Sequence, residues 1–145
     1  MPFCERLTEQ LAIVATVDPV NGLSAATVSD VFSMSLHRRA MFILQTGATV
    51  GTGILCNIQE NPAAAFTAGT ATILTLAATA CTATDSQYLF EVSGEAMGLN
   101  MQYLRGQFTP TGATILSAVV LADVERYHPA SDRDLASVVS IQAAN

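Results

Sequence analysis

Residues that could act in catalysis are few, and they form no recognisable catalytic motif. The only histidines are His37 and His128. No Gly-x-Ser-x-Gly segment, which would present a serine nucleophile, occurs in the chain. Cys4 or Cys81 as a nucleophile would need a partner histidine that the sequence does not place, and inert thiols are far commoner. We therefore predict no catalytic residues and no enzyme activity.

The glycines at Gly47, Gly51 and Gly53 are spaced somewhat like a phosphate-binding turn. Cys56 stands where the third glycine of that motif belongs, and a strand-like alternation follows where a helix should begin. The motif binds phosphate through that helix N-terminus. We therefore expect a plain hairpin turn over 47–53 and no nucleotide cofactor.

Metal sites are also weakly signalled. Asp123 with Glu125, and Asp132 with Asp134, each place two carboxylates on one side of an extended chain. Calcium needs six to eight oxygen ligands, so a solvated strand end and a solvated tail are the favoured interpretations. The three cysteines are an odd set without a Cys-x-x-Cys spacing, which indicates reduced thiols, no disulfide framework and no zinc. We predict no metal and no cofactor.

Charge is scarce in this 145-residue chain. Charged residues make up 12% of it, against about 25% in a typical soluble domain, and all six strong cations are arginines. The segments 40–59, 61–84 and 106–122 carry no charge. Such a surface is expected to face other protein molecules. The net charge of −6 argues against a nucleic-acid partner.

Membrane insertion and secretion are not predicted either. Thr, Gly, Asn and Gln interrupt the uncharged segments before about 18 continuous apolar residues accumulate. The N-terminal segment has acidic residues before its apolar stretch and no basic region, unlike a secretory signal. We expect synthesis in the cytoplasm.

Turn residues divide the chain into short segments typical of a β protein. Asp18-Pro19 with Asn21-Gly22, Asn61-Pro62 and a late hairpin turn at Thr109–Gly112 mark loops besides 47–53. The segments between them predict eight strands, at 11–17, 27–36, 39–46, 53–59, 70–77, 87–93, 101–108 and 113–122. Eight short strands in one domain predict an all-β, two-sheet sandwich, jelly-roll-like in form.

The predicted strands differ in pattern. Ile54, Cys56 and Ile58 alternate with polar or exposed positions, as in a half-buried strand. The continuously apolar segments 40–44 and 117–121 are typical of central strands covered on both faces. A short helix is expected somewhere in the alanine-rich segment 63–83, and a brief helical turn at 95–97.

One domain is predicted over residues 1–145, with a core at 11–125. The segments 1–10 and 126–145 hold charges, small polar residues and few large apolar residues. They are interpreted as an N-terminal arm and a C-terminal arm that lie on a surface.

Interface candidates come from two places. Arg38 and Arg39 precede the apolar segment 40–44 and are interpreted either as a bidentate contact to a carboxylate of a neighbouring subunit or as charged gatekeepers at a strand end. The absence of lysine favours the interface, where arginine is enriched and lysine depleted. The C-terminal arm adds an aromatic anchor, a proline and a mixed-charge group: Arg126, Tyr127, Pro129, Asp132 and Asp134.

Three blocks of the sequence resemble small proteins encoded in the head modules of tailed bacteriophages and prophages. They are Thr8–Ala12 continuing to Asp18-Pro19, Arg38–Ile43, and Ser117–Leu121 with Arg126-Tyr127-x-Pro129-Ala130-Ser131-Asp132-x-Asp134-Leu135, about two fifths of the chain. The resemblance implies a virion structural protein and transfers no catalytic residues.

The expected function is that of a capsid decoration or cement protein on the outer surface of a phage head. Its expected partners are the major capsid protein and further copies of itself, as a dimer or trimer. A tail-tube, head-completion or connector protein is the alternative within virions. A carbohydrate-binding module for host attachment is another, although the chain has no Trp and only three Tyr to form aromatic platforms. A small hydrolase has no support in the residues.

Overall fold

The computed structural model describes residues 10–123. These residues form nine strands and two 3-10 turns. In chain order they are β1 (Ala12–Leu23), β2 (Thr27–Val28), β3 (Phe32–Ser33), β4 (Arg39–Thr46), β5 (Ile54–Asn61), β6 (Ala71–Leu76), η1 (Ala78–Ala80), β7 (Gln87–Ser93), η2 (Gly94–Ala96), β8 (Tyr103–Pro110) and β9 (Thr114–Ala122).

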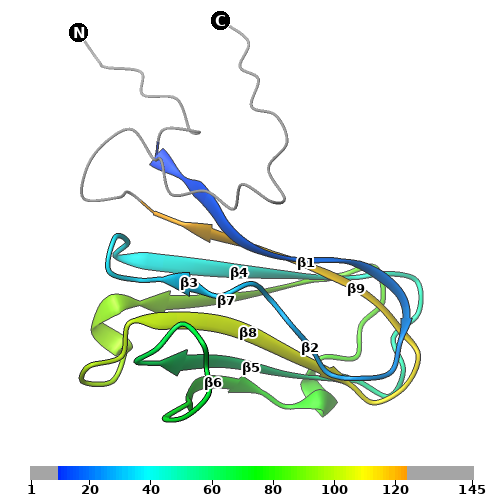
Figure 1. The fold of residues 1–145 in the computed structure, drawn as a ribbon. Helices are drawn as coiled ribbons and strands as arrows, with labels where there is room; N and C mark the ends of the chain where they lie inside the picture. Colours follow the sequence, from blue (N-terminus) through cyan, green and yellow to red (C-terminus); the bar gives the residue numbers. More distant parts are fainter. Residues whose placement is uncertain (1–9, 124–145) are drawn as a thin grey trace, which may run out of the picture.

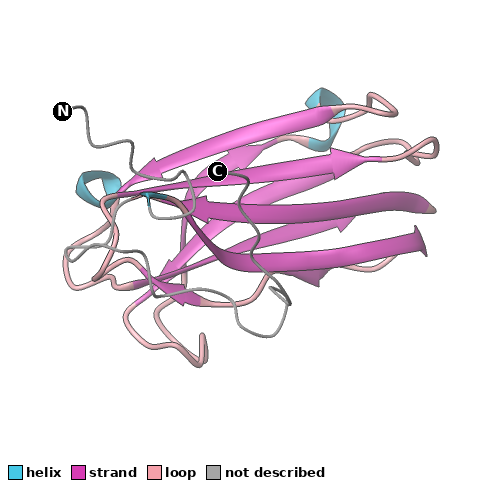
Figure 2. Cartoon of the chain, turned by 90° about the horizontal axis from the view of Figure 1, so that it is seen from above, coloured by secondary structure: helices cyan, strands magenta, loops and turns pink. Residues whose placement is uncertain are grey.

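Two antiparallel sheets pack against each other, as Figure 1 shows. Sheet A has the order β1-β9-β4-β7, and sheet B has the order β2-β8-β5-β6 with β3 also paired to β8. The predicted all-β, two-sheet sandwich is therefore confirmed. Viewed from above, the strands run along the length of the sandwich, and η1 and η2 lie near opposite ends (Figure 2).

The pairing follows the jelly-roll winding. The first strand, β1, pairs with the last, β9; β2 and β3 pair with β8; β4 pairs with β7; and β5 pairs with β6. This is the pattern of a long hairpin folded over on itself. The β4–β9 and β5–β8 pairs then complete the two sheets.

The core lies between the two sheets and follows the two-residue period of the strands. Along β9, buried residues alternate with partly exposed ones over the whole strand. The bulkiest fully buried side chains include Phe42 from sheet A and Phe108 from sheet B. The Phe42 ring also meets the ring of Phe32 at a centroid distance of 5.9 Å.

Six of the eight predicted strands agree with β4 to β9 within two residues at each end. The predicted loop at Asp18–Gly22 is wrong, because β1 continues through it to Leu23. Register shifts between Val17, Val20 and Leu23 absorb the proline and the glycine as bulges while the pairing with β9 continues.

The single predicted strand over 27–36 is also wrong, because the chain divides there into β2 and β3. Ser29 and Asp30 lie between these two strands. Ser29 stays bonded to sheet B, donating its N–H to the Gly106 carbonyl at 2.9 Å. Asp30 instead bonds to Thr16 of sheet A, accepting the Thr16 N–H at 3.2 Å on its carboxylate. These two opposed attachments interrupt the strand.

The glycine-containing turns at 47–53 and 109–112 were expected to be hairpin turns, and that expectation is wrong. The first turn joins β4 of sheet A to β5 of sheet B, and the second returns from β8 to β9. The two connections lie against each other, with the Thr111 N–H donating to the Gly53 carbonyl at 2.9 Å. A Cβ on Gly51 would lie 2.8 Å from the Gly112 Cα, so this crossing needs glycine.

The expected helical segments are confirmed in part of the chain: η1 falls within 63–83, and η2 covers 94–96 beside the predicted 95–97. The predicted arms lie outside the described residues, apart from Gln10. Among residues 10–123, no helix has the length and apolar character needed to cross a membrane.

Candidate interface

The outer face of sheet A, turned away from sheet B, carries a group of apolar side chains. In β4 and β9 the residues facing the core are buried, while Met41, Ile43, Val119 and Leu121 on the opposite side are partly exposed. Leu89 of β7 is 62% exposed. The expectation that segments 40–44 and 117–121 are covered on both faces is therefore wrong for the described residues: β4 and β9 are central in the sheet, but one face of it is open.

Strand register brings these side chains into two adjacent rows. Leu121 lies between Ile13 and Met41 in the first row. Val119 and Leu89 flank Ile43 in the second. Directly opposed residues on one face of an antiparallel sheet have Cβ atoms about 5 Å apart, so the rows form one continuous surface. We call it the apolar face of sheet A: Ile13, Met41, Ile43, Leu89, Val119 and Leu121.

Polar residues border the apolar face at both ends. At one end Gln45 is paired with Ser117 and with Gln87. At the other end Arg39 begins β4, and its Nη1 lies 3.5 Å from the Glu91 Oε1. Both side chains of this ion pair are more than 60% exposed, so the pair contributes little to stability and remains accessible to a partner.

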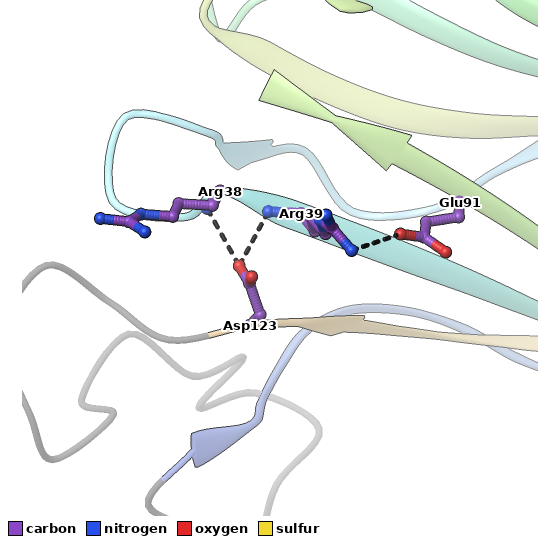
Figure 3. Close-up of polar contacts among 4 residues, drawn as sticks. All are labelled: Arg38, Arg39, Glu91 and Asp123. Carbon is purple, nitrogen blue, oxygen red and sulfur yellow. Dashed lines mark hydrogen bonds and ion pairs between the residues drawn. The ribbon is translucent and has the colours of Figure 1, made fainter. Parts of the chain in front are cut away.

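Asp123 connects the end of β9 to the start of β4 at this charged border, as Figure 3 shows. Its Oδ1 accepts the N–H of Arg38 at 3.0 Å and the N–H of Arg39 at 2.8 Å. The guanidinium of Arg38 points away from Asp123 and Glu91 (Figure 3), and within residues 10–123 it forms no ion pair. Of the predicted arginine pair, Arg39 is thus engaged with Glu91 while Arg38 is available.

An open depression of about 630 Å³ lies at the same charged border. It is lined by His37, Arg38, Arg39, Glu91, Ser93, Gly94 and Glu95. Its lining includes two arginines and two glutamates, which suits a partner surface of mixed charge better than a ligand of one sign.

The remaining predicted interface residues are Arg126, Tyr127, Pro129, Asp132 and Asp134, and all of them lie outside the described residues. Their role stays a prediction. Four carboxylates were considered as metal ligands. Asp123 accepts hydrogen bonds from the backbone N–H groups of Arg38 and Arg39. Glu125, Asp132 and Asp134 lie outside the described residues. Residues 10–123 contain no group of three or more His, Cys, Asp or Glu placed to hold a metal.

His37 and Cys81, the described residues that were considered for catalysis, are both buried. His37 is buried, and its Nδ1 donates to the Asp123 carbonyl at 2.9 Å. Cys56 and Cys81 are both free and buried. A side-chain hydrogen bond with Cys81, and then burial, raise the pKa of the Cys56 thiol well above its ordinary value. A thiol held protonated in this way is a poor nucleophile. Cys81, the cysteine considered as a nucleophile, is the other member of this pair. Its hydrogen bond with Cys56 lowers its pKa while burial opposes that shift, and its fully buried side chain is closed to a substrate.

The outer face of sheet B differs in chemistry from that of sheet A. Its centre consists of amide and guanidinium side chains from β5 and β8: Asn57, Gln59, Arg105 and Gln107. The sandwich therefore has one apolar and one polar outer face. Local sequence reasoning missed both, although the continuously apolar segment 40–44 was a usable signal for the first.

Comparison of the chain with protein-family models, with curated proteins and with solved structures found no significant match.

Proposed function

We propose that this protein is a non-enzymatic structural component of a virion, a capsid decoration or cement protein that docks on the outer surface of a phage head. The observation that carries the proposal is the apolar face of sheet A, which places six apolar side chains next to one another across four strands. The resemblance of three sequence blocks to phage head-module proteins supplies the biological setting.

Several properties of this face support a protein partner. It is apolar at the centre and polar at its borders, which is the arrangement found in protein interfaces. The charged border provides the exposed Arg39–Glu91 pair and the Arg38 guanidinium, which has no ion pair within residues 10–123. Burial of apolar surface contributes roughly 25 cal/mol per Å², and many copies on one lattice multiply that contribution. In the proposal the partner is the major capsid protein, with dimers or trimers of this chain bridging capsomers.

The proposal is tested on purified virions of the phage that encodes the chain, by cryo-electron microscopy with mass spectrometry of the same particles. Density of this protein over the capsomers supports the cement function. Density confined to the neck or tail replaces it with the connector or tail-tube alternative. Absence of the protein from mature particles contradicts a virion role.

The docking surface is tested separately with Leu89→Lys, which places a charge at the most exposed apolar position of the face. We expect this variant to fold and to lose binding to heads that lack the protein. The matched control is Val28→Lys, which makes the same kind of change on sheet B. Val28 lies on β2, and its side chain is 45% exposed. Equal binding by both variants would show that another surface docks.

A further inference from the structure

The polar outer face of sheet B contains a directional chain of side-chain hydrogen bonds. Arg105 Nε donates to Gln59 Oε1 at 2.8 Å, and Gln59 Nε2 donates to Gln107 Oε1 at 2.9 Å. A guanidinium has only donors, so Arg105 fixes which end of the Gln59 amide faces it. Gln59 fixes the Gln107 amide in the same way. The arginine therefore determines the orientation of both glutamines.

This orientation leaves donors without acceptors on the surface. The side-chain carbonyl oxygens of Gln59 and Gln107 each accept a bond within the network, and the Asn57 Oδ1 accepts the Thr75 hydroxyl at 2.9 Å. Within residues 10–123, the Nη groups of Arg105 and the amide nitrogens of Gln107 and Asn57 have no acceptor. The face thus offers N–H groups to a ligand that is rich in oxygen acceptors.

The Arg105 guanidinium also packs against an aromatic ring. The Arg105 Cζ lies 4.3 Å from the centroid of the Phe66 ring, a cation–π contact. Phe66 has a φ of +50°, which is uncommon and strained for a bulky residue. Such backbone strain persists only where the surrounding structure imposes it.

Buried Asn61 supplies that constraint. Its Nδ2 donates to the Ala68 carbonyl and to the Thr70 hydroxyl, both at 2.8 Å, and its Oδ1 accepts the Ala63 N–H at 2.8 Å. These bonds shape the loop between β5 and β6 and so place Phe66 beside Arg105. The guanidinium is therefore fixed by Gln59 on one side and by the Phe66 ring on another, which reduces the entropy lost when it binds a ligand.

We propose that this face binds a carboxylate-bearing saccharide, with Arg105 as the anchor. A guanidinium pairs with a carboxylate through two parallel N–H bonds, and the free Nη groups suit that pairing. Arg105 and Gln107 are two residues apart on β8, about 7 Å, so an amide donor lies one sugar-ring length from the anchor. The amides of Gln107 and Asn57 bind hydroxyl and ring oxygens.

A protein partner is a poorer fit to this face. The centres of protein interfaces are apolar, whereas the centre here consists of amides and one guanidinium. The net charge of −6 repels acidic ligands at long range, so recognition depends on the local donors. The site is on the opposite side of the sandwich from the apolar face of sheet A, so it is independent of the proposed assembly function.

The test is titration of the full chain with trigalacturonate, oligoglucuronate and a sialyl oligosaccharide, followed by backbone NMR shifts. We expect shifts centred on Gln59, Arg105 and Gln107 with at least one probe. The methyl ester of the binding probe lacks the charge and should bind at least tenfold more weakly. Arg105→Gln should lose at least tenfold in affinity. Arg105→Lys should bind almost as weakly as Arg105→Gln, because a lysine cannot form a bidentate contact with a carboxylate.

The matched control is Arg39→Gln, which makes the same charge change on sheet A and should bind like the unaltered protein. Four outcomes overturn the proposal. The first three are no shifts on sheet B with any probe at millimolar concentration, equal binding of acid and ester, and equal losses in Arg105→Gln and Arg39→Gln. Polyglutamate binding as tightly as the saccharides also overturns it, because the site would then recognise acidic protein.

Discussion

Asp123 and Arg39 hold each other by reciprocal hydrogen bonds. The Asp123 carboxylate accepts the Arg39 N–H at 2.8 Å, and the Asp123 N–H donates to the Arg39 carbonyl at 3.0 Å. The same carboxylate also accepts the Arg38 N–H. The end of β9 is thereby fixed to the start of β4 at the charged border of the apolar face.

Replacing Asp123 by alanine should therefore lower the free energy of unfolding by about 1–3 kcal/mol, since hydrogen bonds to a charged acceptor are stronger than neutral ones. Urea unfolding followed by circular dichroism measures the change. Glu95→Ala is the control, because Glu95 is an exposed acid in η2 and its loss should have little effect. Equal effects of the two variants would show that the Asp123 bonds contribute nothing.

Asn61→Ala should destabilise the domain by about 2–3 kcal/mol. The side chain is fully buried and makes three hydrogen bonds, so its removal leaves a cavity and takes away the bonds that hold the Ala63 N–H, the Ala68 carbonyl and the Thr70 hydroxyl of the loop. Thermal unfolding reports the stability, and the NMR shifts of Phe66 report the loop. The exposed Gln87 serves as control in Gln87→Ala. A variant as stable as the parent would contradict the structural role of Asn61.

Gly53→Ala should be far more damaging than Gly22→Ala. Both glycines have a positive φ, but a Cβ on Gly53 would lie 2.1 Å from the Ala78 carbonyl oxygen, whereas a Cβ on Gly22 meets nothing within 4 Å. Gly22→Ala should cost about 1–2 kcal/mol of backbone strain alone. Gly53→Ala should exceed that by at least about 2 kcal/mol or abolish folding. Parallel melting curves separate the two effects, and matching losses would contradict the close approach of η1.

The thiol of Cys56 should resist alkylation in the folded protein. Both its hydrogen bond with Cys81 and its burial raise its pKa, so the reactive thiolate is scarce at pH 8 as well as inaccessible. We expect iodoacetamide to modify Cys56 on the order of 100-fold more slowly in buffer than in urea. Peptide mass spectrometry after timed labelling gives both rates. Comparable rates would mean that β5 opens readily to solvent.

Much of the fold could be predicted from local patterns. The alternation of Ile54, Cys56 and Ile58 correctly identified β5, and all three side chains are fully buried. Prediction failed where long-range pairing overrides local chemistry. The Asp18-Pro19 and Asn21-Gly22 pairs favour turns, yet bulged pairing with β9 keeps this segment in β1.

The candidate sites were harder to predict, because their members are far apart in the chain. Arg39 was identified at a strand start, but its partner Asp123 is 84 residues away. Gln59 and Arg105, separated by 46 residues, meet only through the register of β5 and β8. A single sequence carries no local signal for such register, so neither network could be derived from it.

The position of β9 has a consequence for how the chain is made. This strand is the last of the described ones, and it inserts between β1 and β4 in the interior of sheet A. Until the ribosome releases it, β1 has no partner in its sheet and the inner side of β4 is unpaired. Sheet A therefore cannot form, and its apolar segments stay open to chaperones and proteases, until β9 has emerged. Fragments that end before residue 114 lack β9 and should not accumulate as folded protein.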